Sequence, residues 1–219
     1  REVKRPYFVN AWIDWAMIGG LSIAAYFVLV FLGGRAHEQA LSALTLWSYS
    51  WIINGTHFAA TNFRLYHSRE SLRQYPMTAA LIPLVLLAGL WAALSHPATL
   101  APYFVKLFLF WSPYHYSGQS LGISLVYARR AGFYLGNYER LALGGFIYGT
   151  FVASVVYGEV GLGPRDYFGV VFPSLGLPFL LWPLTLGALS LCGGALIFFL
   201  ARRWALGDRV APIILLPAA

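Results

Sequence analysis

Long apolar stretches alternate with short polar segments along the chain, as expected of a membrane protein. Six apolar runs are long enough to cross a bilayer, given about 20 residues for about 30 Å of hydrocarbon. They cover residues 11–32, 41–64, 77–94, 100–128, 141–157 and 175–201. A further apolar start, from residue 211 to 219, is too short to cross, and we interpret it as the beginning of an incomplete seventh span. The pattern predicts one all-α domain over residues 1–219, a polytopic transmembrane helical bundle of six or more spans.

The composition agrees with this fold class. Of the 219 residues, 59% are hydrophobic and only 11% are charged, whereas a soluble domain has about 25% charged residues. The chain has one cysteine, Cys192, and it lies in an apolar run. A disulfide framework and a cysteine-based metal motif are therefore excluded.

The basic residues lie on one side of the predicted spans. Twelve of them precede the first span or follow the second, fourth and sixth spans, whereas the other connections hold only Arg35 and Arg165. An excess of Lys and Arg marks the cytoplasmic side of a membrane protein, so we expect a cytoplasmic N-terminus. The net charge of +7 is then explained by topology and by contact with anionic membrane lipids, without nucleic acid as a partner.

Polar side chains form one stripe along each of two predicted spans. The stripe of the second span consists of Ser50, Asn54, His57 and Thr61, and that of the fourth span of Ser112, His115 and Gln119. Because polar groups at bilayer depth are costly, they normally face a cavity or each other. We expect the two stripes to face one another in the cytoplasmic half of the bundle, with Asp14 of the first span beside them.

These side chains are the predicted site. Neutral imidazole is the commonest metal ligand in proteins, and iron and zinc sites combine it with carboxylates. The predicted metal ligands are His57, His115 and Asp14, and the predicted cofactor-binding residues are His57, His115, Asn54 and Gln119. Such a site, with iron as its metal, would support the oxidation of a lipid or isoprenoid that arrives through the bilayer.

Two other interpretations of the same residues stay open. His, Asn and Gln side chains inside a bundle also hydrogen-bond across helices, which contributes about 0.6 kcal/mol per bond. Two histidines on facing helices also ligate a haem or a chlorophyll-type pigment, and the 17% aromatic content would pack such a ring system. The alternative function is therefore a non-catalytic subunit of a larger membrane complex, which binds haem, pigment or lipid.

Glycines and prolines predict local features of the fifth and sixth spans. Small residues permit close helix contacts, and the glycines in question are Gly145, Gly149, Gly187, Gly193 and Gly194. Residues 161–176, rich in glycine and proline, are predicted to form an interfacial or re-entrant segment. Pro178 and Pro183 predict a kink where the sixth span begins. A transporter, whose binding site such a break would serve, is the third alternative.

Two short motifs resemble those of known membrane proteins. The motif Thr-His-Phe-x-x-Thr begins at Thr56, and His-Tyr-x-x-Gln begins at His115; both resemble motifs of uncharacterised bacterial multi-pass membrane proteins. That resemblance implies a bacterial inner membrane. His57-Phe58 is also similar to the His-Phe-Gly element of the Brp/Blh family, membrane carotenoid-cleaving dioxygenases that use histidine-bound iron. The chain lacks that family's Asp after His-Phe-Gly and its other histidines, so the resemblance implies a ligand role for His57 alone.

Overall fold

The computed structural model describes residues 7–20, 24, 27, 55, 57–160, 163, 165–167, 169–208 and 212–215. The chain divides into two compact units. The first unit combines residues 1–22 with residues 102–219, and the second consists of residues 23–101.

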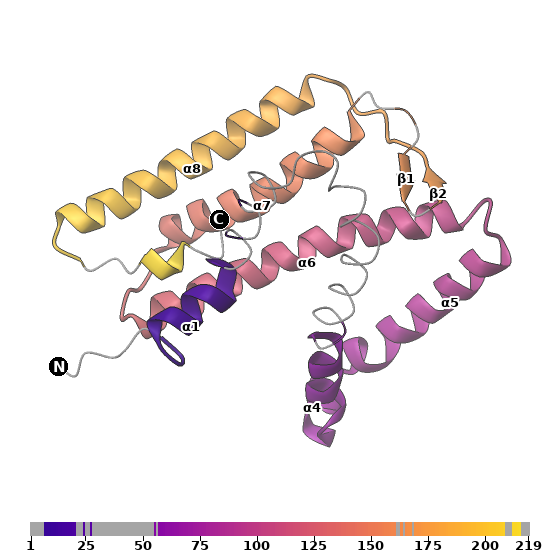
Figure 1. Cartoon of the computed structure of the whole chain (residues 1–219), viewed down its shortest axis with the longest axis horizontal. Coiled ribbons are helices and arrows are strands. Elements are labelled where there is room, and N and C mark those ends of the chain that lie inside the picture. The colour runs from indigo at the N-terminus through magenta and orange to yellow at the C-terminus, as the bar shows by residue number, and fades with distance from the viewer. Residues whose placement is uncertain are drawn as a thin grey trace. The chain divides into compact units, whose positions relative to one another are not determined.

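The described elements are almost all helices (Figure 1). In chain order they are α1 (Ala11–Trp15), the π-helix η1 (Ala16–Gly20), α4 (Arg69–Gln74), the π-helix η2 (Met77–Leu81), α5 (Ile82–Ser95), α6 (Ala101–Arg130), α7 (Asn137–Glu159), β1 (Arg165–Tyr167), β2 (Val170–Phe172), α8 (Leu181–Ala205) and the 3-10 helix η3 (Pro212–Ile214). Residues 57–66 are helical as well. For the described residues, the structure thus confirms the helical class that the sequence predicts.

Three described helical segments are long and apolar enough to cross a membrane: Met77–Ser95, Asn137–Glu159 and Leu181–Ala205. They correspond to the third, fifth and sixth predicted spans. Of the first two predicted spans, 11–32 and 41–64, the structure describes only residues 11–20, 24 and 27 and residues 55 and 57–64. The prediction of six or more spans therefore stays a prediction, and so does the cytoplasmic N-terminus.

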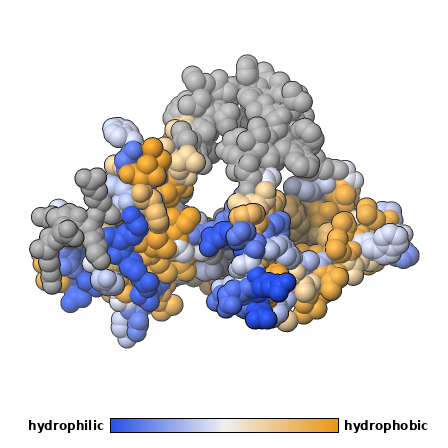
Figure 2. All heavy atoms as spheres, turned by 90° about the horizontal axis from the view of Figure 1, so that it is seen from below, coloured by the Kyte–Doolittle hydropathy of each residue, from blue (hydrophilic) through white to orange (hydrophobic). Residues whose placement is uncertain are grey.

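Large apolar side chains reach the surface of the described helices. On α5, Trp91 and Leu94 are 75% and 71% exposed, and on α8, Leu191 and Trp204 are 76% and 77% exposed. Figure 2 shows apolar residues over much of the described surface. Soluble monomers rarely expose contiguous apolar patches larger than a few hundred Å². This surface agrees with a protein that is solvated partly by lipid.

Glycines allow α7 and α8 to pack closely along their length. A Cβ atom on Gly145 would lie 2.8 Å from Cys192 Sγ, and one on Gly149 would lie 3.0 Å from Leu189 Cδ1. On α8, a Cβ atom on Gly193 would lie 3.2 Å from the ring of Phe146. The predicted close contact is confirmed at these three glycines. The other two glycines of the prediction, Gly187 and Gly194, have open space where a Cβ atom would be.

α6 runs antiparallel along α7 for nearly the whole length of α7 (Figure 1). Lys106, near the start of α6, donates a hydrogen bond to Glu159, the last residue of α7. Further along, the rings of Tyr114 and Tyr148 have centroids 5.7 Å apart. Because α8 packs on α7 as well, α7 lies between α6 and α8 in the first unit (Figure 1).

The hydrophobic core of the first unit lies where α6 ends and α7 begins. Its buried residues come from α6, α7, α8, η3 and the connection between α6 and α7: Tyr127, Ala128, Phe133, Leu135, Ala142, Leu143, Ile147, Leu196, Ile213 and Ile214. The core therefore joins the ends of three helices that are antiparallel neighbours.

Side-chain contacts fix the short helix α1 at its N-cap and hold the segment that precedes it. Asn10 caps it, because its side-chain oxygen accepts a hydrogen bond from the Ile13 N–H at 2.9 Å. Arg130, at the end of α6, donates from Nη2 to the Tyr7 carbonyl at 2.8 Å. The guanidinium of Arg130 also lies 4.1 Å from the centre of the Phe8 ring. The segment before α1 is thus held against the arginine-rich end of α6.

A two-stranded antiparallel hairpin follows α7, in the segment that the sequence predicts to be interfacial or re-entrant. β1 and β2 pair Arg165 with Phe172 and Tyr167 with Val170. Gly169, between the strands, adopts φ = +81°, a conformation that strains residues with a side chain. The described part of this segment thus forms a short hairpin, and its interfacial or re-entrant location stays a prediction.

The last long helix, α8, begins at Leu181, later than the start at Leu175 that the sequence predicts. Pro178 lies before the helix, and Pro183 lies in its first turn, where the missing N–H costs no helical hydrogen bond. Both prolines therefore fit the beginning of α8.

In the second unit, α4 and η2 follow the helical residues 57–66. Ser68 caps α4, because its Oγ accepts a hydrogen bond from the Ser71 N–H at 3.1 Å. The Tyr66 hydroxyl donates to the Ala79 carbonyl at 2.6 Å, which joins the end of the helical residues 57–66 to η2.

Candidate functional site

Two of the predicted site residues lie together at the middle of α6. His115 is the fifteenth of its 30 residues, about 21 Å from the start of the helix at about 1.5 Å per residue. Its Nε2 lies 3.0 Å from Nε2 of Gln119, one turn further along. Because an amide nitrogen can only donate, the ring nitrogen of His115 is the acceptor in this arrangement. The structure therefore confirms that these two side chains share one side of the helix.

The His115–Gln119 pair lies on the side of α6 opposite two buried serines. Ser117 and Ser124 are buried, and at 100° per residue they point roughly 140–180° away from the pair. His115 is exposed and Gln119 is half-buried. The pair is thus accessible on the side of α6 that faces away from the buried serines.

An aromatic cluster lies beside the pair. The ring of Tyr114 has its centroid 5.9 Å from that of Trp111, 5.7 Å from that of Tyr148 and 6.0 Å from that of Phe151. The cluster occupies the turn of α6 that precedes His115 and the adjacent turns of α7. Aromatic walls with a few polar groups are typical of sites for small apolar molecules.

Asp14, a predicted metal ligand, is buried, and its carboxylate has protein partners. Oδ2 accepts hydrogen bonds from the Phe8 N–H and from the Tyr127 hydroxyl, the latter at 2.8 Å, and Oδ1 accepts one from the Val9 N–H at 3.1 Å. Tyr127 lies twelve residues beyond His115 in α6, about 18 Å along the helix axis. α1 and α6 therefore meet, as the sequence analysis assumes, but the structure does not bring Asp14 to His115.

His57 belongs to the second unit and lies at the start of the helical residues 57–66. Its carbonyl accepts a hydrogen bond from Thr61 Oγ1 at 2.9 Å, and its ring centroid lies 6.0 Å from that of Phe58. Asn54 lies outside the described residues. The prediction that the two polar stripes face one another therefore stays a prediction.

In the part of the chain that the structure describes, no group of three or more His, Cys, Asp or Glu side chains is arranged to hold a metal ion. The metal role of His57, His115 and Asp14 is thus an inference from sequence.

A buried ion pair joins α6 and α7, and sequence reasoning missed it. Lys106 Nζ donates to Glu159 Oε2 at 2.7 Å and to the Pro173 carbonyl at 2.6 Å. The two side chains are 8% and 5% exposed. Glu159 Oε2 also accepts a hydrogen bond from the Leu175 N–H, so the pair fixes the segment after the hairpin. The position of Lys106 in the sequence could have indicated such a pair, because an ionisable residue inside an apolar run normally has a partner.

A second ion pair lies at the other end of α7. Arg203 of α8 donates from Nε to Glu139 Oε1 at 2.7 Å and from Nη2 to Oε2 at 3.0 Å, a bidentate arrangement. Arg203 Nη1 also reaches Asp208 Oδ2 at 3.0 Å. Glu139 Oε2 accepts a hydrogen bond from the Gly136 N–H at 2.6 Å, which connects the pair to the beginning of α7.

No family model, curated protein or solved structure matches the chain. The polar pair on α6 and the two ion pairs of α7 are the features from which we infer a function.

Proposed function

We propose that this chain is an integral membrane protein that binds a lipid-soluble molecule on α6, with His115 and Gln119 contacting its polar group. The observation that supports this best is the hydrogen-bonded pair at the middle of a 30-residue helix, on the side opposite the buried serines. Polar side chains at bilayer depth are costly and by default mark ligand or substrate sites. Imidazole and amide groups together donate and accept hydrogen bonds, which suits a hydroxyl or carbonyl group on an apolar molecule.

The proposal requires α6 to cross the membrane, and its pairing with α7 supports this. α6 is not among the three described segments that are long and apolar enough to cross a membrane, but it runs antiparallel to α7, which is one of them. If α7 crosses the bilayer, then α6, which runs along it, crosses the bilayer as well. Thirty residues extend about 45 Å, which exceeds about 30 Å of hydrocarbon, so His115 lies near the bilayer centre.

The distribution of arginines supports a cytoplasmic side for one end of the bundle. Five arginines lie where α6 and α8 end and α7 begins: Arg129, Arg130, Arg140, Arg202 and Arg203. The opposite end carries Lys106 and Arg165. By the positive-inside rule we infer that the arginine-rich end is cytoplasmic and that the N-terminus is on the same side. The membrane that we propose is a bacterial inner membrane.

The chemistry that we propose for this site is metal-dependent oxidation of a lipid or isoprenoid. His115 offers an imidazole, the commonest protein metal ligand, and histidine-bound iron with open positions activates oxygen. His57 is the second ligand that the sequence predicts, and Asn54 and Gln119 are the predicted supporting residues. We leave Asp14 out of the ligand set, because both of its carboxylate oxygens already accept hydrogen bonds.

The second candidate function is a non-catalytic subunit of a larger membrane complex that holds haem, a pigment or a lipid. The aromatic cluster of Trp111, Tyr114, Tyr148 and Phe151 beside His115 favours it. Aromatic side chains pack against flat ring systems, and a histidine is a common axial ligand of haem.

Elemental analysis and an absorption spectrum of the full chain, purified in mild detergent, separate the two candidates. Near-stoichiometric iron without a Soret band supports oxidation, whereas a Soret or pigment band supports the subunit. His115→Leu should remove the metal or the colour. The matched control is His96→Leu, the same change at the exposed C-cap of α5, and it should remove neither. Metal or colour that persists in His115→Leu would exclude His115 as a ligand.

A further inference from the structure

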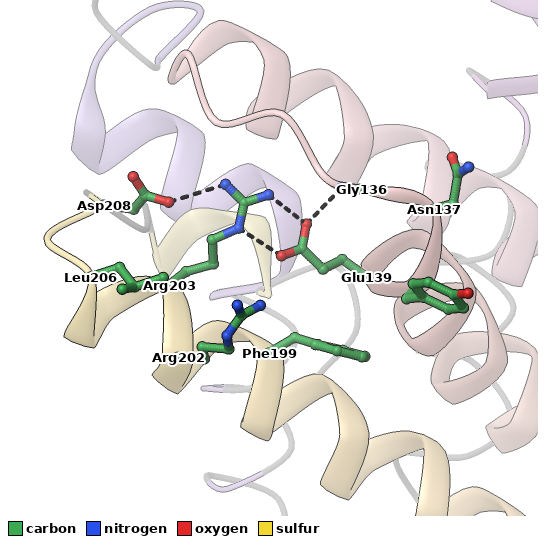
Figure 3. A pocket seen from close by; sticks show the side chains of 9 residues that line it. Gly136, Asn137, Glu139, Phe199, Arg202, Arg203, Leu206 and Asp208 are labelled. Carbon is green, nitrogen blue, oxygen red and sulfur yellow. Dashed lines mark hydrogen bonds and ion pairs between the residues drawn. The ribbon is translucent and has the colours of Figure 1, made fainter.

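A pocket of about 330 Å³ lies where α7 begins and α8 ends (Figure 3). It is lined by Gly136, Asn137, Tyr138, Glu139, Phe199, Arg202, Arg203, Leu206 and Asp208. The lining combines two cations and two carboxylates with aromatic and aliphatic side chains, so the formal charges of the pocket cancel. The pocket is distinct from the His115 site, which lies at the middle of α6.

The charged side chains that line this pocket differ in whether they form ion pairs within the protein. Arg203 is bound by Glu139 and Asp208, as the dashed lines of Figure 3 show. The guanidinium of Arg202 takes no part in that network and lies beside Phe199 (Figure 3). Arg202 is exposed, and Asp208 keeps 44% of its side chain exposed. The cation of Arg202 is therefore available to a ligand, and the carboxylate of Asp208 is accessible although its Oδ2 pairs with Arg203.

The first turn of α7 adds donors to the same pocket. Its N-cap is Gly136, whose own N–H donates to Glu139 Oε2 and which has no side chain to accept from the N–H groups of Asn137 and Tyr138. Asn137 and Tyr138 of this turn line the pocket. Uncapped N–H groups at a helix start favour an anionic oxygen, and a phosphate is the usual one. Arg202 and the beginning of α7 thus suit a phosphate group together.

We propose that this pocket binds the headgroup of a zwitterionic glycerophospholipid. Its phosphate lies at Arg202 and the first turn of α7, and its ammonium group lies at Asp208. The proposal rests on α8 crossing the bilayer, which its length and composition allow. The cancelling charges of the lining favour a headgroup that carries both signs over an anionic one.

The surface of α8 provides a place for the acyl chains. Phe199 lines the pocket, and Leu191 and Phe198, which lie on the same side of α8 as Arg202, are 76% and 62% exposed between the pocket and the opposite end of the helix. Apolar surface that leads away from a headgroup pocket along a membrane helix matches a diacyl lipid better than a soluble zwitterion.

Native mass spectrometry of the full chain in detergent, titrated with phosphatidylethanolamine or with phosphatidylglycerol, tests the proposal. We expect saturable binding of phosphatidylethanolamine and weaker binding of phosphatidylglycerol. Arg202→Gln should weaken phosphatidylethanolamine binding about tenfold, as expected for loss of one charge-assisted hydrogen bond. The matched control is Arg140→Gln, which removes the same charge from the same end of the bundle and should leave binding unchanged. Asp208→Asn should reduce the preference for phosphatidylethanolamine over phosphatidylglycerol.

Three results would overturn the proposal. Equal weakening by Arg202→Gln and Arg140→Gln would indicate general charge attraction, and preference for phosphatidylglycerol would exclude recognition of the ammonium group. Displacement of the lipid by inorganic phosphate at millimolar concentration would indicate a site for a soluble anion. Because Arg202 is exposed, its variant should unfold at the same temperature as the unmodified chain, so a change in binding would not reflect unfolding.

Discussion

The two ends of α7 each carry a buried glutamate that pairs with a cation, but the surroundings of the two pairs differ. Glu159 and Glu139 are 4% and 7% exposed. The side chain of Lys106, the partner of Glu159, is 8% exposed, whereas that of Arg203, the partner of Glu139, is 32% exposed. The first pair is enclosed by helices and by the segment after the hairpin. The second pair opens onto a pocket.

This difference in burial indicates that the two ion pairs have different roles, although each joins a glutamate to a cation. An enclosed pair gives a ligand no access, and its loss would leave an uncompensated charge inside the protein. A partly exposed pair is screened by solvent, and its neighbours are available to a ligand. The burial of the Lys106–Glu159 pair therefore fits a role in the stability of the fold, whereas the Arg203–Glu139 end is the one that we propose to bind a lipid headgroup.

The largest effect on stability is expected from Glu159→Leu. It leaves Lys106 buried without its carboxylate, which should cost about 3–5 kcal/mol. Denaturant unfolding in detergent micelles, followed by circular dichroism, measures the loss. The double variant Lys106→Met/Glu159→Leu should recover most of it, since both charges are then removed. A loss under about 1 kcal/mol for Glu159→Leu would show that this end is solvated like the other one.

A smaller effect is expected between the two ends, where α7 packs on α8. Gly145→Ala places a Cβ atom 2.8 Å from Cys192 Sγ, and such overpacking should cost about 1–3 kcal/mol. Cys192→Ala removes that sulfur, so the double variant should recover stability in the same unfolding assay. The control is Gly194→Ala, because nothing lies within 4 Å of its Cβ position. An equal loss in both alanine variants would contradict close packing at Gly145.

Arg203→Gln should cost about 1–2 kcal/mol, less than Glu159→Leu, because the guanidinium is partly solvated and Glu139 keeps the Gly136 N–H as a donor. The unfolding measurement is repeated at low and high salt. Salt should reduce the difference between Arg203→Gln and the unmodified chain, and it should leave the effect of Glu159→Leu nearly unchanged. Equal losses of stability and equal salt dependence for Arg203→Gln and Glu159→Leu would contradict the proposed difference between the two ends of α7.

The smallest effect on stability is expected from His115→Leu, within about 1 kcal/mol, because its hydrogen bond to Gln119 lies on an exposed side of α6. The same unfolding assay measures it. A cost as large as that of Glu159→Leu would indicate that the His115–Gln119 pair stabilises the fold rather than binding a ligand.

The sequence predicted three of the described apolar helical segments, because apolar length is a local property. The predicted spans 77–94 and 141–157 lie within the observed apolar segments Met77–Ser95 and Asn137–Glu159. The hairpin was not predicted, since its strands have three residues each and show no alternating pattern of useful length.

Two residues of the predicted site lie together because their contact depends only on helical spacing. His115 and Gln119 are four residues apart, and one helical turn brings them together. The partner of Asp14 is Tyr127, 113 residues away, and the partner of Lys106 is Glu159, 53 residues away. Such partners are set by how helices pack, which hydropathy and local spacing do not contain.

The most direct test of ligand binding on α6 is mass spectrometry of the lipid-soluble compounds that copurify with the protein. We expect the unmodified chain and the control His96→Leu to carry the same compound, an apolar molecule with a hydroxyl or carbonyl group. The compound should be lost from His115→Leu and reduced in Gln119→Leu, while both variants remain folded. The same amount of compound in His115→Leu as in the unmodified chain would contradict a binding site at this pair.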